Sequence, residues 1–91
     1  MEKSTLRELG ATYCGDGIWE LDSGGYVDTI LSIEFFDGFN GELEWSAFLK
    51  DKRTNHCVGV MSNRTDDEFR ELCRLLQTFP VTAKLKDHDH A

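Results

Sequence analysis

The residues that could act as a nucleophile and its base are Cys14, in a glycine-rich turn, and His56, at the start of a predicted strand. A thiol nucleophile needs a base within hydrogen-bond reach and a third group that orients the base. Asp16 could be that third group, but the spacing of the three residues does not require them to meet. His56 and Cys57 should not form a dyad, because neighbouring strand residues point to opposite faces. We therefore predict that the protein is not an enzyme, and a small thiol-dependent enzyme using Cys14 or His56 is the second alternative.

Other polar groups have types that suit metal or phosphate chemistry, but they lack the arrangement that this chemistry needs. His88 and His90 stand near the C-terminus beside aspartates, in a polar tail that cannot preorganise a closed metal site. The turn at residues 14–17 has no lysine, serine or threonine for a phosphate loop, and Asp16 would repel the phosphate. We predict neither a metal nor a cofactor.

Acidic residues are the chemical feature that stands out from this background. No lysine or arginine occurs between Arg7 and Lys50. That stretch holds nine acids, which are Glu8, Asp16, Glu20, Asp22, Asp28, Glu34, Asp37, Glu42 and Glu44. On an exposed strand, Glu42 and Glu44 lack the burial and the neighbours that separate the two pKa values of an acid–base pair. The acids are therefore interpreted as a charged surface, which either binds a basic partner or only keeps the protein in solution.

The composition limits the classes of partner and the compartment. The 91 residues include 17 acids and ten bases, for a formal net charge of -7. This charge repels phosphate and anionic lipid, so we expect no direct nucleic-acid binding and no membrane binding. The sequence has no apolar run near the roughly 18 residues of a membrane span and no signal-peptide pattern at its start, which predicts a cytoplasmic protein. Three widely spaced cysteines fit reduced thiols better than a disulfide framework.

Turn signals divide the middle of the chain into short runs rich in β-branched and aromatic residues. The predicted strands are residues 18–22, 26–36, 42–50 and 55–61. Their short connections favour an antiparallel meander. The third strand alternates between apolar and polar residues, which predicts one buried and one wet face. The buried face would carry Leu43, Trp45, Ala47 and Leu49, and the wet face Glu42, Glu44, Ser46 and Phe48.

A short helix is predicted at residues 4–10, ahead of the strands. Thr5 and Glu8 have the spacing of a capping box, and Gly10 can supply the left-handed residue that ends the helix. An isolated helix of this length is unstable in water, so its leucines must pack on the rest of the domain.

A longer amphipathic helix is predicted at residues 66–79. Thr65 and Glu68 form a second capping box, and Pro80 disfavours helical geometry at the residue before it. The apolar stripe of this helix is Phe69, Leu72, Cys73, Leu76 and Phe79. Opposite the stripe, the predicted core includes Leu31, Ile33, Phe35 and Val58, besides the buried face of the third strand.

These elements predict one α+β domain that spans residues 1–91. A short N-terminal helix precedes a four-stranded antiparallel β-meander, and a C-terminal amphipathic helix packs on one sheet face. The ordered core would span about residues 4–82, and residues 83–91 would form a polar tail.

The predicted function is that of a non-enzymatic binding protein, an inhibitor or adaptor that docks an acidic sheet face on a basic protein partner. Size and charge alone make it analogous to small acidic proteins of phages, mobile elements and immunity systems. The predicted partner-binding residues are Glu34, Asp37, Phe39, Glu42, Glu44 and Phe48. The first alternative is a homodimer that forms through a free sheet edge or through apolar residues on the wet face.

Overall fold

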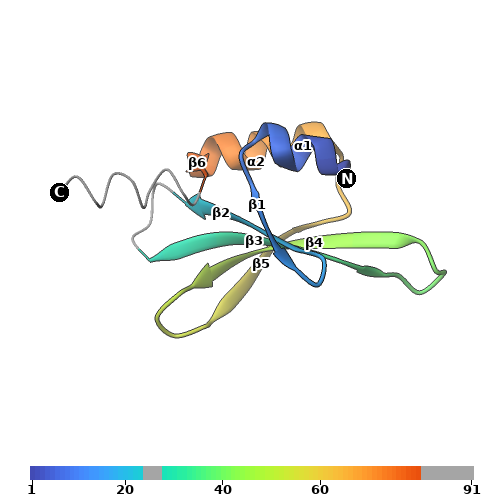
Figure 1. Ribbon diagram of the computed structural model, residues 1–91, viewed down its shortest axis with the longest axis horizontal. Helices are drawn as coiled ribbons and strands as arrows, with labels where there is room; N and C mark the ends of the chain where they lie inside the picture. Colours follow the sequence, from blue (N-terminus) through green and yellow to red (C-terminus); the bar gives the residue numbers. More distant parts are fainter. Residues whose placement is uncertain (24–27, 81–91) are drawn as a thin grey trace.

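The computed structural model describes residues 1–23 and 28–80 and shows an antiparallel sheet with both helices on one of its faces (Figure 1). The strands are β1 (Thr12–Gly15), β2 (Ile18–Ser23), β3 (Thr29–Asp37), β4 (Leu43–Asp51), β5 (Cys57–Ser62) and β6 (Thr78–Phe79). The helices are α1 (Lys3–Glu8) and α2 (Asp66–Leu76). Strands β1 to β5 pair in chain order, and β6 pairs with β2. The predicted α+β class and the antiparallel sheet are confirmed, but the predicted four-stranded meander differs in detail, because β1 and β6 add two strands to the described sheet. The predicted tail at residues 83–91 lies outside the described residues.

The hairpin of β1 and β2 was missed, because the prediction placed the first strand at Ile18. Asp16 and Gly17 connect the two strands with φ values of 54° and 75°, the left-handed conformation that both central residues of a type I′ turn adopt. The Asp-Gly pair is therefore a hairpin turn. Strand β1 gave no periodic signal because it is a four-residue edge strand whose first three residues are all exposed.

Helix α2 begins as predicted and ends three residues early. The Thr65 hydroxyl accepts a hydrogen bond from the Glu68 N–H at 3.1 Å, and the Glu68 carboxylate accepts one from the Thr65 N–H, so the capping box is confirmed. At the other end Gln77 adopts the left-handed conformation and stops the helix. Phe79 is extended because Pro80 follows it, and it pairs with Asp22 at the edge of β2. It is half-buried and does not belong to the helical stripe.

Helix α1 forms where the sequence predicts it, but the predicted role of Thr5 is wrong. The helix begins at Lys3, one residue before the predicted start, and has no side-chain cap. Thr5 lies inside the helix, is buried, and donates its hydroxyl proton to Asp66 Oδ2 at 2.6 Å. Gly10 follows the helix with a φ of 86°, which agrees with the predicted left-handed end.

The core lies between the two helices and the face of the sheet that they cover (Figure 1). Its buried members are Leu6, Trp19, Leu21, Leu31, Ile33, Trp45, Ala47, Phe69 and Cys73. Phe69 of α2 meets Trp45 of β4 edge to face, with ring centroids 5.5 Å apart. Leu43 and Val58, both predicted to be core residues, are 61% and 64% exposed. They lie toward opposite ends of the sheet, beyond the area that the helices cover.

The face of the sheet without helices is recessed and partly buried, whereas the sequence predicted a wet face. Ser32 and Ile30 lie on this face and are nevertheless buried. Asp22, one of the nine acids interpreted above as a charged surface, is also buried, with Lys52 Nζ 3.9 Å from its carboxylate. A groove of about 280 Å³ on this face is lined by residues of all five strands from β1 to β5, so the sheet curves around it.

Candidate functional site

The β3–β4 hairpin, residues 34–45, extends beyond both helices (Figure 1). Its tip carries exposed apolar side chains. Phe39 at its turn is fully exposed, and Phe36 and Leu43, which lie on opposite faces of the hairpin, are also exposed. Residues 1–23 and 28–80 have six exposed large apolar side chains, and the other three are Tyr13, Val58 and Leu75. Single exposed apolar residues are common, whereas a cluster of them marks an interaction surface. The hairpin tip is therefore the candidate site.

Backbone hydrogen bonds hold the turn that presents Phe39. The Gly38 N–H donates to the Glu42 carbonyl at 2.7 Å, and the Gly41 N–H donates to the Gly38 carbonyl at 3.0 Å. Gly41 has a φ of 78°, which a residue with a side chain adopts only with strain. The side chain of Phe39 is thus displayed by a closed turn, which lowers the ordering cost of binding through it.

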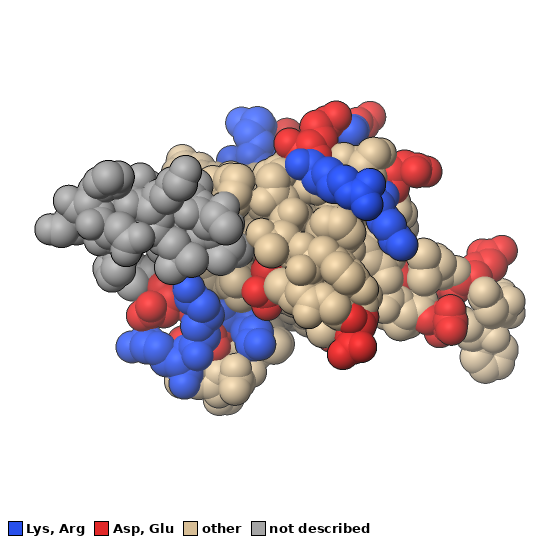
Figure 2. Space-filling model, viewed as in Figure 1, with Lys and Arg blue, Asp and Glu red and all other residues tan. Residues whose placement is uncertain are grey.

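Acidic side chains surround the apolar tip. Asp37 and Glu42 flank the turn and are exposed, and Glu34 is exposed further down β3. Glu44 is half-buried, and its carboxylate accepts a hydrogen bond from the Asn63 amide at 3.2 Å. Figure 2 shows acidic groups at this end of the molecule. No lysine or arginine occurs on the hairpin, so its field is uniformly negative.

The six predicted partner-binding residues do not share one face. Glu34, Glu44 and Phe48 occupy the face without helices, with Phe48 half-buried in the groove. Asp37 pairs with Leu43 and so lies on the opposite face. The two remaining residues, at positions 39 and 42, lie in the turn. The structure therefore gathers most of these residues around the hairpin and leaves Phe48 in the groove.

Leu43 is a member of the apolar tip that sequence reasoning assigned to the core. The predicted sheet face of Leu43 is correct, since Leu43 lies two residues before Trp45 on β4 and on the same face. The pattern identifies a face, but it does not reveal where the helices stop covering that face. The sequence signal that could have indicated its exposure is its position directly after the turn at residues 38–42.

Cys14 does not have the surroundings of an activated nucleophile. Partial burial, together with a hydrogen bond and the negative charge of Glu20, raises the pKa of its thiol to about 11. Reactive cysteines need the opposite shift, because the thiolate is the nucleophile. Cys14 lines the groove, and His56 lines a separate pocket together with Asp51. Asp16 lines a third pocket. The three groups that a thiol enzyme would use are therefore not brought together in the described part of the chain.

Two other features bear on function. Within residues 1–23 and 28–80, no three histidine, cysteine, aspartate or glutamate side chains are arranged to hold a metal ion. His88 and His90 lie outside these residues. Neither described helix has the length and apolar character needed to cross a bilayer.

Comparison with known proteins gives no family assignment. No protein family model, no curated protein and no solved structure matches this chain. The proposed function therefore depends on the geometry and chemistry of the chain's own residues.

Proposed function

We propose that this protein is a non-enzymatic binding protein that docks its β3–β4 hairpin on a basic protein partner. The observation that carries the proposal is Phe39, fully exposed on a closed turn between Asp37 and Glu42. Burying a phenylalanine side chain stabilises a complex by about 1.5–3 kcal/mol. Acids around such an anchor attract a basic surface and speed association. The partner would therefore present an apolar socket bordered by lysine or arginine.

This arrangement suits an inhibitor or adaptor that works in the cytoplasm. A projecting tip can enter a recess of the partner, whereas a patch on a flat sheet surface cannot. The pKa of the Cys14 thiol is raised rather than lowered, which supports a non-enzymatic role. Two exposed thiols, Cys14 and Cys57, suit a reducing compartment.

A photo-crosslinking experiment tests the proposal. A photoreactive phenylalanine analogue at position 39 should crosslink a basic protein in extracts of the native cells, and the same analogue at Leu75 should not. Leu75 is the matched control, because it is exposed on α2, away from the hairpin. With the purified partner, Phe39→Ser should weaken binding by about 2 kcal/mol or more, and Leu75→Ser should leave it unchanged. Binding should also weaken as sodium chloride rises.

Two results would overturn the proposal. One is a recovered partner whose affinity is the same for Phe39→Ser and Leu75→Ser. The other is a partner whose crosslinked surface is acidic, since the charges around the tip would then repel it.

A homodimer remains the alternative, and strand β5 is the observation that favours it. Within the described residues β5 pairs only with β4, and its Val58 is exposed. A free edge with apolar side chains can pair with a second copy. Sedimentation across a dilution series tests this alternative. Val58→Lys should convert a dimer to a monomer, and a wild-type chain that stays monomeric at high concentration would exclude the dimer.

A further inference from the structure

Trp19 contains a buried hydrogen-bond donor without a partner. The side chain is only 6% exposed, and no acceptor among the described residues binds its indole Nε1–H. An unsatisfied buried donor costs about 1–3 kcal/mol, so native proteins pair nearly all of them. A donor left in this state calls for an acceptor that residues 1–23 and 28–80 do not supply.

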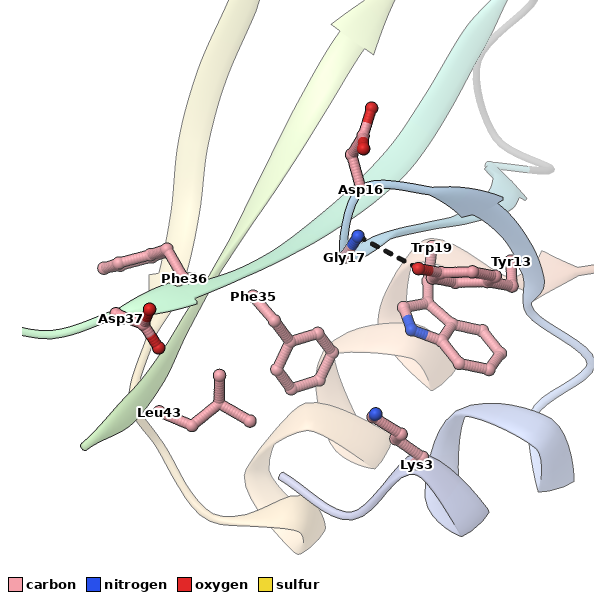
Figure 3. A pocket seen from close by; sticks show the side chains of 9 residues that line it. All are labelled: Lys3, Tyr13, Asp16, Gly17, Trp19, Phe35, Phe36, Asp37 and Leu43. Carbon is pink, nitrogen blue, oxygen red and sulfur yellow. Dashed lines mark hydrogen bonds between the residues drawn. The ribbon is translucent and has the colours of Figure 1, made fainter. Parts of the chain in front are cut away.

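The indole nitrogen points into a pocket of about 290 Å³ between α1 and the root of the β3–β4 hairpin (Figure 3). Phe35 and Leu43 form an apolar wall, and the ammonium group of Lys3 lies on the helix side. The volume is near the lower end of the range for small-molecule sites. The pocket therefore combines an apolar chamber with a polar end near Trp19.

One cation, Lys3, lines this pocket, and a second, Arg7, lies in the pocket next to it. Lys3 and Arg7, one helical turn apart on α1, line an adjoining pocket together with Tyr13 and Trp19. The Arg7 guanidinium carbon is 6.0 Å from the centre of the Trp19 ring. Among the described residues, neither cation has a carboxylate within 4.0 Å, although the chain is strongly acidic. Two unpaired cations beside an unpaired donor favour an anionic ligand group.

Tyr13 adds a further donor. Its hydroxyl oxygen accepts a hydrogen bond from the Gly17 N–H at 3.2 Å, which leaves the hydroxyl proton available to a ligand. Asp16 and Asp37 line other parts of the pocket. These carboxylates disfavour a ligand with a second negative charge, such as a phosphate monoester dianion, so a single carboxylate fits the site better.

We propose that this pocket binds a small monocarboxylate with an apolar body. The carboxylate accepts hydrogen bonds from Trp19 Nε1–H and the Tyr13 hydroxyl and pairs with Lys3 and Arg7. The apolar body lies against Phe35 and contacts the base of the hairpin. This site adjoins the proposed docking tip, because Phe36 and Leu43 line the pocket, but it does not include Phe39, the anchor of the docking proposal.

Octanoate is the probe, with octylammonium as the ligand of opposite charge and the same apolar body. In ¹H–¹⁵N spectra the chain has two indole N–H signals, from Trp19 and Trp45. Octanoate should move the Trp19 signal, which Trp19→Phe identifies by its loss, and leave the Trp45 signal in place. Calorimetry should show one site for octanoate and no comparable binding of octylammonium.

Variants of exposed cations separate this site from general apolar binding. Lys3→Gln and Arg7→Gln should each weaken octanoate binding about tenfold, since each removes a charged partner. Lys50→Gln is the matched control, because Lys50 lines the groove on the opposite face. Both α1 side chains are exposed, so their variants should fold normally.

Three outcomes would overturn the proposal. They are an unmoved Trp19 indole signal at saturating octanoate, equal affinity for octylammonium, and octanoate binding that Lys3→Gln and Arg7→Gln leave unchanged. A failure of partner binding by Phe39→Ser has no bearing on these measurements, so the two proposals fail independently.

Discussion

The Thr5 hydroxyl donates a hydrogen bond of 2.6 Å to Asp66 Oδ2 and so joins α1 to the first turn of α2. The backbone N–H of Glu2 donates to the same oxygen at 3.1 Å. One turn further along α2, Arg70 contacts both Glu8 and Asp67. A six-residue helix has little stability of its own, so these contacts and the burial of its apolar side chains hold α1 in place.

The Thr5–Asp66 bond predicts a pH-dependent stability. Two hydrogen bonds, one from the Thr5 hydroxyl and one from the Glu2 N–H, hold the pKa of the Asp66 carboxyl below its ordinary value. The resulting stabilisation is complete above the unfolded-state pKa, about 3.9, and is lost as the pH falls through the lower folded-state value. Asp66→Asn should lower the free energy of unfolding by about 1–3 kcal/mol at pH 7. Urea unfolding should show this difference shrinking toward about pH 2, and a difference independent of pH would contradict the prediction.

The capping box of α2 predicts a second effect on stability. Thr65→Ala removes the oxygen that accepts the Glu68 N–H and should lower the free energy of unfolding by about 1 kcal/mol. Thr65→Ser keeps an accepting hydroxyl and serves as the control. Thermal unfolding of both variants tests this prediction. Equal losses of stability in the two variants would show that the threonine methyl group, rather than the capping hydrogen bond, stabilises the protein.

Phe69 and Leu75 on α2 should respond very differently to truncation. Phe69 is fully buried against Trp45, so Phe69→Ala should lower the free energy of unfolding by about 3–5 kcal/mol. Leu75→Ala, at an exposed site of the same helix, should change it by less than about 0.5 kcal/mol. Urea unfolding measures both changes. Similar losses in the two variants would mean that α2 presents another face to the sheet.

Cys14 should be slow to react at neutral pH. Its thiol pKa of about 11, against an ordinary value of 9.0, implies about 100-fold less thiolate than in the unfolded chain near pH 8. Alkylation by iodoacetamide, followed by peptide mass spectrometry, should accelerate as the pH approaches about 11 in the native protein. Glu20→Gln should speed the reaction, because Glu20 raises this pKa. An alkylation rate of the native protein that levels off near pH 9, the ordinary pKa of a thiol, would refute the raised pKa of Cys14.

Much of the fold could be predicted because its signals are local. The Thr65–Glu68 capping box, the turn residues and the alternation around Trp45 each depend on residues a few positions apart, and all three reappear in the structure. Strand β1 lacked such a signal, since an exposed edge strand of four residues shows no periodicity. The candidate site was foreseen only in part. Phe39 and its neighbouring acids could be selected from the turn, whereas Leu43 was assigned to the core.

The sequence by itself thus determined the α+β class, the antiparallel order of the main strands and the acidic character of the hairpin. Only the tertiary structure decided where the helices stop covering the sheet, which exposes Leu43, and which groups meet around Trp19. Lys3 and Leu43 are 40 positions apart, yet they line one pocket. Such proximity depends on how α1 is placed, bonded to α2 through Thr5 and Asp66 and packed into the core through Leu6, and no local pattern encodes that placement.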